Sequence, residues 1–330
     1  MLTHRSLDFW MKSVHTRRIS FFLSLAIFVA IVFAAFQNKD AVREMILKAD
    51  FFWLIAGVIC YACNYFFRSY RLWLYTNKTG VLIPAYLKIT GIHGFNSYFL
   101  PMRSGDLTLP FLLRLHAEIP LAVGGRILVR ARVLDITSLG YLIFLAILLT
   151  PSEMPAVWRL LLISAGIAFV LIPYVAFYII RHDTVSLNSW LCRVIGEGKP
   201  EYPVLRETLV SLVIWFWIGC TIYCVIRSLD IPLSFYDVWL LVAIQLPLQM
   251  FPIQGLANSG NHEVGWVLAL GLFGIAASDG LPIALASHAV FISYAILLGA
   301  VALVLPSRES GRADPKRDSP NVLSSDKVIP

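Results

Sequence analysis

The chain has 330 residues, of which 58% are hydrophobic and only 14% are charged, and its mean hydropathy is +0.74. Soluble domains carry roughly 25% charged residues, so this composition excludes a soluble enzyme and indicates an integral membrane protein. Membrane helices need about 20 residues each, which leaves no room for a cytosolic catalytic domain. The net charge of +7 is spread over connecting segments, so it indicates membrane orientation and anionic headgroups rather than nucleic acid.

Hydropathy divides the chain into three parts. Residues 1–18 are polar and basic, which predicts a cytoplasmic N-terminal segment by the positive-inside rule. Residues 19–305 form the membrane domain, and residues 306–330 are expected to be a disordered cytoplasmic tail. The sequence predicts an all-α integral membrane protein, a polytopic helical bundle of about six full spans plus two broken or re-entrant elements. The six predicted spans are Ile19–Phe36, Phe51–Phe67, Val133–Thr150, Leu160–Ile180, Thr208–Ile226 and Leu281–Leu305.

The first broken element is the apolar run Val81–Leu100, which stops at Pro101 and is followed by Gly105. Proline blocks helix continuation, and glycine adopts backbone angles closed to other residues. Backbone freed from helical bonding at membrane depth must lie within protein or line a watery cavity. If this run crossed the membrane, the arginine-rich connection after it would lie outside, against the positive-inside rule. We therefore expect a re-entrant hairpin or a span paired with Leu107–Leu115.

The second broken element separates Phe235–Phe251 from the short apolar run Val264–Ala277. Its structural breaks are expected at Pro252, Gly255 and Gly260. Transporters commonly build sites where discontinuous helices from inverted repeats face each other. We therefore predict that the two breaks enter from opposite sides of the membrane and that their polar residues meet.

Ionisable groups inside membrane segments cost roughly 2.5–3.5 kcal/mol on insertion scales, so each is a functional candidate. Arg103 beside Asp106 offers a planar donor fork suited to phosphate, although a salt bridge that merely closes the hairpin is equally open. Arg132 and Asp135 are three residues apart at the start of a span, so they can meet on one helix face.

His262 and Glu263 open the short run at Val264. The carboxylate could cap the helix, or the helix N-terminus could bind an anion while Glu263 relays protons. His288 is a lone histidine on an apolar helix, and no His-Glu-x-x-His pattern is present, so no metal site is expected.

The sequence predicts no catalytic residue and no cofactor. Nucleophile-elbow, P-loop and dinucleotide-binding glycine patterns are absent, which counts against enzymes that act on soluble substrates. The two Cys-x₂₋₃-Cys pairs lie in apolar runs, where buried thiols are common, so redox chemistry is not expected.

These residues resemble a known family. The pattern runs through Arg68 and Arg71, Asn96, the segment from Leu100 to Asp106, Arg132 with Asp135, and Pro252 through glycines to Glu263. It is similar to the lysylphosphatidylglycerol synthase transmembrane, or flippase-like, family, which includes the membrane half of the bacterial multiple peptide resistance factor. The resemblance covers about residues 15–306 and adds Asn96 to the expected substrate-binding residues.

The chain departs from the family pattern at two places. Asp106 stands where the family usually has Glu, and a loose run from Gly255 to Glu263 replaces a compact Pro-Gly-Gly-x-Gly-x-x-Glu. The aminoacyl-transferase domain of the resistance factor is not seen, so lysyl transfer is not expected.

The resemblance implies a protein of the bacterial inner membrane that moves the headgroup of a phospholipid or a polyprenyl-phosphate-linked glycan. Two alternatives stay open. One is a membrane-embedded glycosyl- or phospho-transferase that uses Asp106 or Glu263 as a base. The other is a non-catalytic scaffold of a glycan or lipid assembly complex.

The charge pattern predicts the membrane topology. Both termini, and the connection over residues 101–132, should lie in the cytoplasm, because this connection is the most arginine-rich of the chain. Reporter proteins fused after Leu121 and after Pro306 should both give cytoplasmic signals. An exported signal at Leu121 would contradict the re-entrant arrangement.

Overall fold

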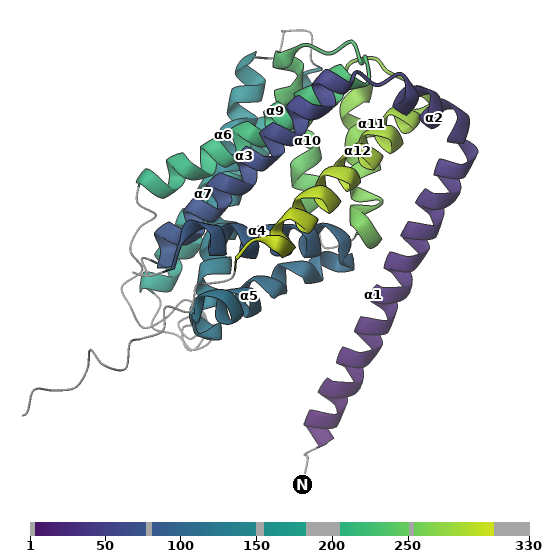
Figure 1. Ribbon diagram of the computed structural model, residues 1–330. Helices are drawn as coiled ribbons and strands as arrows, with labels where there is room; N and C mark the ends of the chain where they lie inside the picture. Colours follow the sequence, from purple (N-terminus) through teal and green to yellow (C-terminus); the bar gives the residue numbers. More distant parts are fainter. Residues whose placement is uncertain (1–3, 77–80, 150–154, 183–204, 251–253, 307–330) are drawn as a thin grey trace, which may run out of the picture.

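In the computed structural model, all the regular elements within the described residues (4–76, 81–149, 155–182, 205–250 and 254–306) are helices (Figure 1). The predicted all-α polytopic fold is confirmed. The helices are α1 (His4–Gln37), α2 (Lys39–Leu47), α3 (Phe51–Thr76), α4 (Ile83–Phe99), η1 (Pro101–Leu107), α5 (Thr108–Ala117), α6 (Leu121–Leu149), α7 (Ala156–His182), α9 (Leu205–Ser228), α10 (Phe235–Met250), η2 (Leu256–Asn258), α11 (Asn261–Gly271) and α12 (Ala277–Val304).

Four of the described helices, α3, α6, α9 and α12, are long and apolar enough to cross a membrane. A fifth span results if Phe21–Gln37 and Lys39–Leu47, which meet at a bend of 73°, are taken together. The described apolar part of α7, Ala156–Leu171, is shorter than these spans. Six full spans were expected from the sequence, and the sixth depends on the remainder of α7.

Several helices extend beyond their predicted ends. α1 begins at His4, so most of the polar N-terminal segment is helical and continuous with the first span. α3 runs to Thr76 and α6 begins at Leu121, so arginines that were expected in cytoplasmic connections lie inside helices. These arginines were interpreted as marking the ends of spans. Two of them pair with carboxylates on neighbouring helices, Arg71 with Asp135 and Arg130 with Glu207, and this pairing allows them to lie within the bundle.

The predicted connection between Gln37 and Asp50 contains the helix α2, which packs against α12. Its charged side chains are exposed, and Lys48 Nζ lies 2.6 Å from Glu44 Oε1 one turn away. Such a pair supports a short surface helix. The segment is therefore a helix rather than an open loop.

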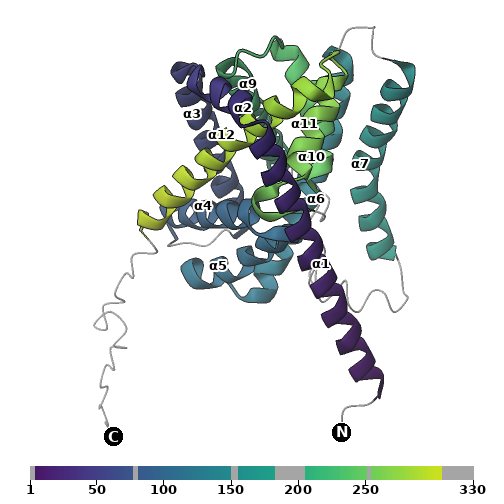
Figure 2. The same ribbon diagram turned by 90° about the vertical axis from the view of Figure 1, so that its right-hand side faces the viewer.

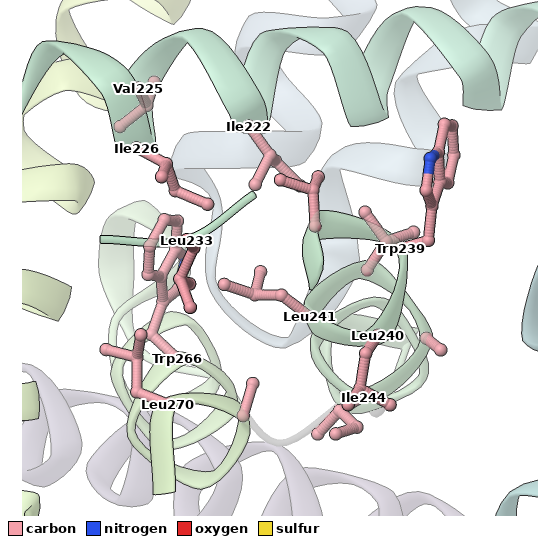
Figure 3. Packing of buried hydrophobic residues seen from close by; sticks show 14 of the residues in the cluster. Ile222, Val225, Ile226, Leu233, Trp239, Leu240, Leu241, Ile244, Trp266 and Leu270 are labelled. Carbon is pink, nitrogen blue, oxygen red and sulfur yellow. The ribbon is translucent and has the colours of Figure 1, made fainter. Parts of the chain in front are cut away.

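The larger of the hydrophobic clusters among the described residues draws on α6, α7, α9, α10, α11 and α12, and Figure 3 shows the part where α9, α10 and α11 face one another. Ile222 and Ile226 of α9 point toward Leu241 of α10 and Trp266 of α11, and all four side chains are buried. Asn64 of α3 donates a hydrogen bond from Nδ2 to the carbonyl oxygen of Ile214 on α9 at 3.0 Å, as expected for interhelical polar contacts in membranes. Together these contacts fix the frame that holds the two breaks.

The first break forms a hairpin. α4 ends at Leu100, and η1 contains two left-handed residues, Met102 (φ 56°) and Arg103 (φ 53°). α5 then folds back against α4, and the two helices lie across the lower part of the molecule in Figure 2. The predicted pairing of the run before Pro101 with the run after it is confirmed, while its depth in the membrane stays a prediction.

The second break contains η2, with Ala257 (φ 53°), Asn258 (φ 61°) and Gly260 (φ 89°) all in the left-handed region. The next helix, α11, begins at Asn261 rather than at the predicted Val264 and ends at Gly271 rather than Ala277. The break predicted at Pro252 lies outside the described residues, whereas Gly255 and Gly260 lie in the break as expected.

A close backbone approach requires glycine at residue 105. A Cβ added there would lie 2.1 Å from the carbonyl oxygen of Asn96. We expect Gly105→Ala to destabilise the protein by about 1–3 kcal/mol or more, because backbone atoms must move to admit the methyl group. Thermal unfolding in detergent is the measurement. Gly125→Ala is the control, since a Cβ at Gly125 meets nothing within 4 Å. Equal stability of the two variants would contradict the expected close packing at the hairpin.

Candidate functional site

The two breaks meet in space. The backbone N–H of Met102 donates to the carbonyl oxygen of Gln254 at 3.3 Å, and Gln254 Nε2 donates to the carbonyl oxygen of Leu100 at 3.4 Å. Nη1 of Arg103 also donates to the carbonyl oxygen of Gln249, at the end of α10, at 2.5 Å. The prediction that polar groups of the two breaks meet is confirmed, and their entry from opposite membrane sides stays a prediction.

A cavity of about 180 Å³ lies beside this meeting point. Three arginines line it, Arg68 of α3, Arg103 of η1 and Arg132 of α6, and no described carboxylate does. The uncharged polar residues in its lining include His93, Ser97, Gln245, Gln249, Gln254, Asn258 and His262. The aromatic residues are Tyr61, Tyr65, Tyr98, Trp215 and Phe291.

A chain of alternating charges lies behind the cavity, and we call it the arginine–aspartate network. Arg103 Nε lies 3.3 Å from Asp106, and Nη2 of Arg132 lies 2.5 Å from the other oxygen of the same carboxylate. Arg132 Nη1 also lies 3.3 Å from Oδ2 of Asp135. The other carboxylate oxygen of Asp135 accepts a hydrogen bond from Nη1 of Arg71 at 2.7 Å. The network joins η1, α6 and α3, so it fixes the first break against two long helices.

The network and Arg68 carry an excess of positive charge. Arg68, Arg71, Arg103 and Arg132 lie beside Asp106 and Asp135, while the nearby Glu207 is paired with Arg130, so four cations against two anions leave a net charge of +2. Arg68 forms no ion pair with any described residue, and its buried Nε has no hydrogen-bond partner there. Uncompensated charge in a low-dielectric interior is costly, so an anion in the cavity would be strongly favoured.

A second buried pair, of a carboxylate and an imidazole, supports the other break. Nδ1 of His288 on α12 is bonded to Oε1 of Glu263, and its Nε2 lies 2.6 Å from the carbonyl oxygen of Ala257. Oε2 of Glu263 accepts the backbone N–H of Gly260 at 2.7 Å. The expectation that His288 stands alone is wrong, because packing of α11 on α12 brings it to Glu263 from 25 residues away.

The family model described as "Lysylphosphatidylglycerol synthase TM region" matches residues 21–299. The chain belongs to this family. Searches for similar curated proteins and similar solved structures found no match. Membership identifies a membrane protein connected with lipids, as the sequence resemblance implied.

Of the residues that were expected to bind substrate, some line the cavity and others lie behind the lining. Arg103, Arg132 and His262 line the cavity, whereas Asp106 and Glu263 lie behind it and hold lining residues or the break. Asp135 lines a smaller neighbouring cavity of about 30 Å³. Asn96 does not line the main cavity either, but its carbonyl oxygen accepts the N–H of Leu100 at 2.9 Å where α4 ends.

Arg68, which lines the cavity, and Arg71, which belongs to the arginine–aspartate network, were not predicted from the sequence as site residues. Both were expected at the cytoplasmic end of a span that was predicted to stop at Phe67. A helical spacing was available as a signal, because Asn64, Arg68 and Arg71 recur at intervals of four and three residues and so share one helix face. The glutamines of the lining, such as Gln245, carry no comparable signal.

Asp135 is the structural centre of the network. Its side chain is 1% exposed and pairs with two arginines. We expect Asp135→Asn to destabilise the protein by about 3–5 kcal/mol, because removing one partner of a buried pair leaves an uncompensated charge. Thermal unfolding and expression yield measure this. Asp40→Asn at the exposed start of α2 is the matched control and should have a small effect. Similar unfolding of both variants would contradict the central role of Asp135.

Proposed function

We propose that the protein binds the anionic headgroup of a phospholipid or a polyprenyl-phosphate-linked glycan in this cavity and moves it across the bacterial inner membrane, with both termini in the cytoplasm. The observation that carries the proposal is the lining itself. Arg68, Arg103 and Arg132 face one space that no described carboxylate enters. A cationic cavity in a membrane protein connected with lipids is best matched to a phosphate group.

The available donors suit phosphate. Nη2 of Arg103 forms no hydrogen bond with a described residue, and the guanidinium of Arg68 has no ion-pair partner there. Guanidinium groups present planar forks that match the oxygens of phosphate bidentately. A phosphomonoester with about two negative charges would compensate the net charge of +2 in the network and Arg68, and a phosphodiester with one negative charge would halve it.

The size and the aromatic wall of the cavity favour a headgroup rather than a whole lipid. A volume of about 180 Å³ admits on the order of ten water molecules, so acyl or prenyl chains must stay outside. Tyr61, Tyr65, Tyr98 and Trp215 line the same space. Aromatic side chains combine an apolar face with a polar tip, and this combination is suited to a glycerol or sugar moiety next to the phosphate.

The site offers little support for the transferase alternative. Neither oxygen of Glu263 faces the cavity freely, because one is bonded to His288 and the other to the N–H of Gly260. Asp106 is bonded to Arg103, Arg132 and Ser97. A general base must lie within hydrogen-bond reach of the substrate proton, and neither Asp106 nor Glu263 lines the cavity. A scaffold, for its part, would not require a cationic cavity.

Headgroup movement in proteoliposomes tests this proposal. The purified protein is reconstituted with fluorescent phosphatidylglycerol, or with a labelled polyprenyl-phosphate sugar, and a membrane-impermeant quencher reports transfer between leaflets. We expect Arg68→Gln to weaken headgroup binding about 10- to 100-fold, since hydrogen bonds to charged groups contribute about 1.5–3 kcal/mol. Translocation at limiting lipid should fall accordingly, while the fold should be retained.

Two further variants complete the test. Arg126→Gln is the matched control, because Arg126 lies on α6 with Arg132 but does not line the cavity, and it should behave as wild type. Arg103→Lys should impair translocation although the charge stays, since lysine cannot bind phosphate bidentately. Wild-type activity in both Arg68→Gln and Arg103→Lys, or a chemically altered lipid as product, would refute the proposal.

A further inference from the structure

The hydrogen-bond geometry of the pair Glu263–His288 requires a shared proton. The partner of His288 Nε2 is the backbone carbonyl of Ala257, which can only accept, so Nε2 carries a hydrogen. Nδ1 faces Oε1 of Glu263, while Oε2 already accepts the N–H of Gly260. One more proton must lie between Nδ1 and Oε1, because without it two lone pairs would oppose each other. Whichever atom holds this proton, the pair is then neutral as a whole.

Because the pair is buried, loss of this proton would leave a charge inside the protein. The side chains of His288 and Glu263 are 6% and 2% exposed, and no other described residue forms an ion pair with Glu263. A carboxylate left without its proton would be a buried, uncompensated charge. The polar or titratable groups on the packed elements include His262 of α11, Ser287 and Tyr294 of α12, Asn258 and Ser259 of the second break, Tyr98 of α4, Tyr61 of α3 and Gln245 of α10. The charged residues of α2, which also packs on α12, are exposed.

The pair is connected mechanically to the cavity. It binds both ends of the segment 257–260, through the carbonyl of Ala257 and the N–H of Gly260. Asn258 within this segment and His262 just after it line the cavity, and the His262 ring stacks on His288 with centroids 4.5 Å apart. Two non-glycine residues of the segment are left-handed, a conformation that persists only when surrounding bonds enforce it.

We propose that Glu263 and His288 form the proton-binding site that couples headgroup movement to a proton gradient. With the proton bound, the pair is neutral, the second break is bonded at both ends and the cationic cavity accepts an anion. After release of the proton, the pair carries one negative charge beside the cavity and opposes the break conformation. Proton and anionic headgroup therefore bind together and leave together, as in symport. This inference rests on the proposed function and adds its coupling ion.

Glu263→Gln separates coupling from folding. An amide in place of the carboxylate can donate to Nδ1 of His288 and accept the N–H of Gly260, so it reproduces the protonated pair with no proton to release. Glu44→Gln, on the exposed face of α2, is the matched control. His288→Gln is the second variant, because its amide N–H can still reach the carbonyl of Ala257. Folding of each variant is checked by thermal unfolding in detergent.

The transport measurement uses proteoliposomes with tracer fluorescent phosphatidylglycerol and an imposed pH difference of one unit. With one proton per headgroup, wild-type protein should sustain up to about a tenfold excess of tracer in the leaflet that faces the alkaline side. Glu44→Gln should do the same, while Glu263→Gln and His288→Gln should give a ratio near one. An unbiased distribution with the wild type, accumulation on the acidic side, or a wild-type bias in Glu263→Gln would overturn the proposal.

Infrared difference spectroscopy between two pH values reads the proton site without transport. The wild type should show a carboxyl or imidazole protonation band that is lost in Glu263→Gln and kept in Glu44→Gln. If the wild type moves no lipid at all but shows this band, the proposed function fails while the proton site stands. If the band is missing or survives in Glu263→Gln, the proton site is refuted whatever the lipid assay gives.

Discussion

Arg132 forms ion pairs with two carboxylates at once, Asp106 in the first break and Asp135 one turn along its own helix. Inside a membrane protein such a bridge is a constraint on everything around it, because each buried charge needs a partner at close range. Asp135 in turn binds Arg71 of α3, so three elements are fixed by one alternating series. The hairpin between α4 and α5 can hold Met102 and Arg103 in left-handed backbone because these contacts enforce it.

Each break contains a buried carboxylate, and the two carboxylates are compensated by different side chains. In the first, Asp106 is compensated by guanidinium groups, which stay charged at every accessible pH. In the second, Glu263 is compensated by a single histidine, whose charge depends on one proton. The first break therefore holds its carboxylate with permanent cations, while the second holds its carboxylate with a histidine. Gln254 bonds to both Met102 and Leu100, so the two breaks are joined directly by hydrogen bonds.

The sequence predicts those parts of the site that are local. Pairs three residues apart, such as Arg103 with Asp106 and Arg132 with Asp135, follow from helical spacing alone, and both breaks follow from proline and glycine. The bonds that assemble the site join distant residues, for example Arg71 to Asp135, 64 positions apart. Such pairs depend on which helices pack together, and no spacing within one segment specifies that. Arginines inside α3 and α6 were interpreted as span ends because their partners could not be seen.

A headgroup can enter this cavity only if its apolar chains remain in the bilayer, and that requires an opening toward the lipid. The region between α9, α10 and α11 is filled by buried hydrophobic side chains. α1 stands apart from this core and touches the body mainly at the two breaks and α2, where Ser24 donates to the carbonyl oxygen of Gln254 at 2.8 Å. On that side, only α1 and the breaks would have to separate. The segments that hold the charged groups of the two breaks are therefore the ones that α1 covers.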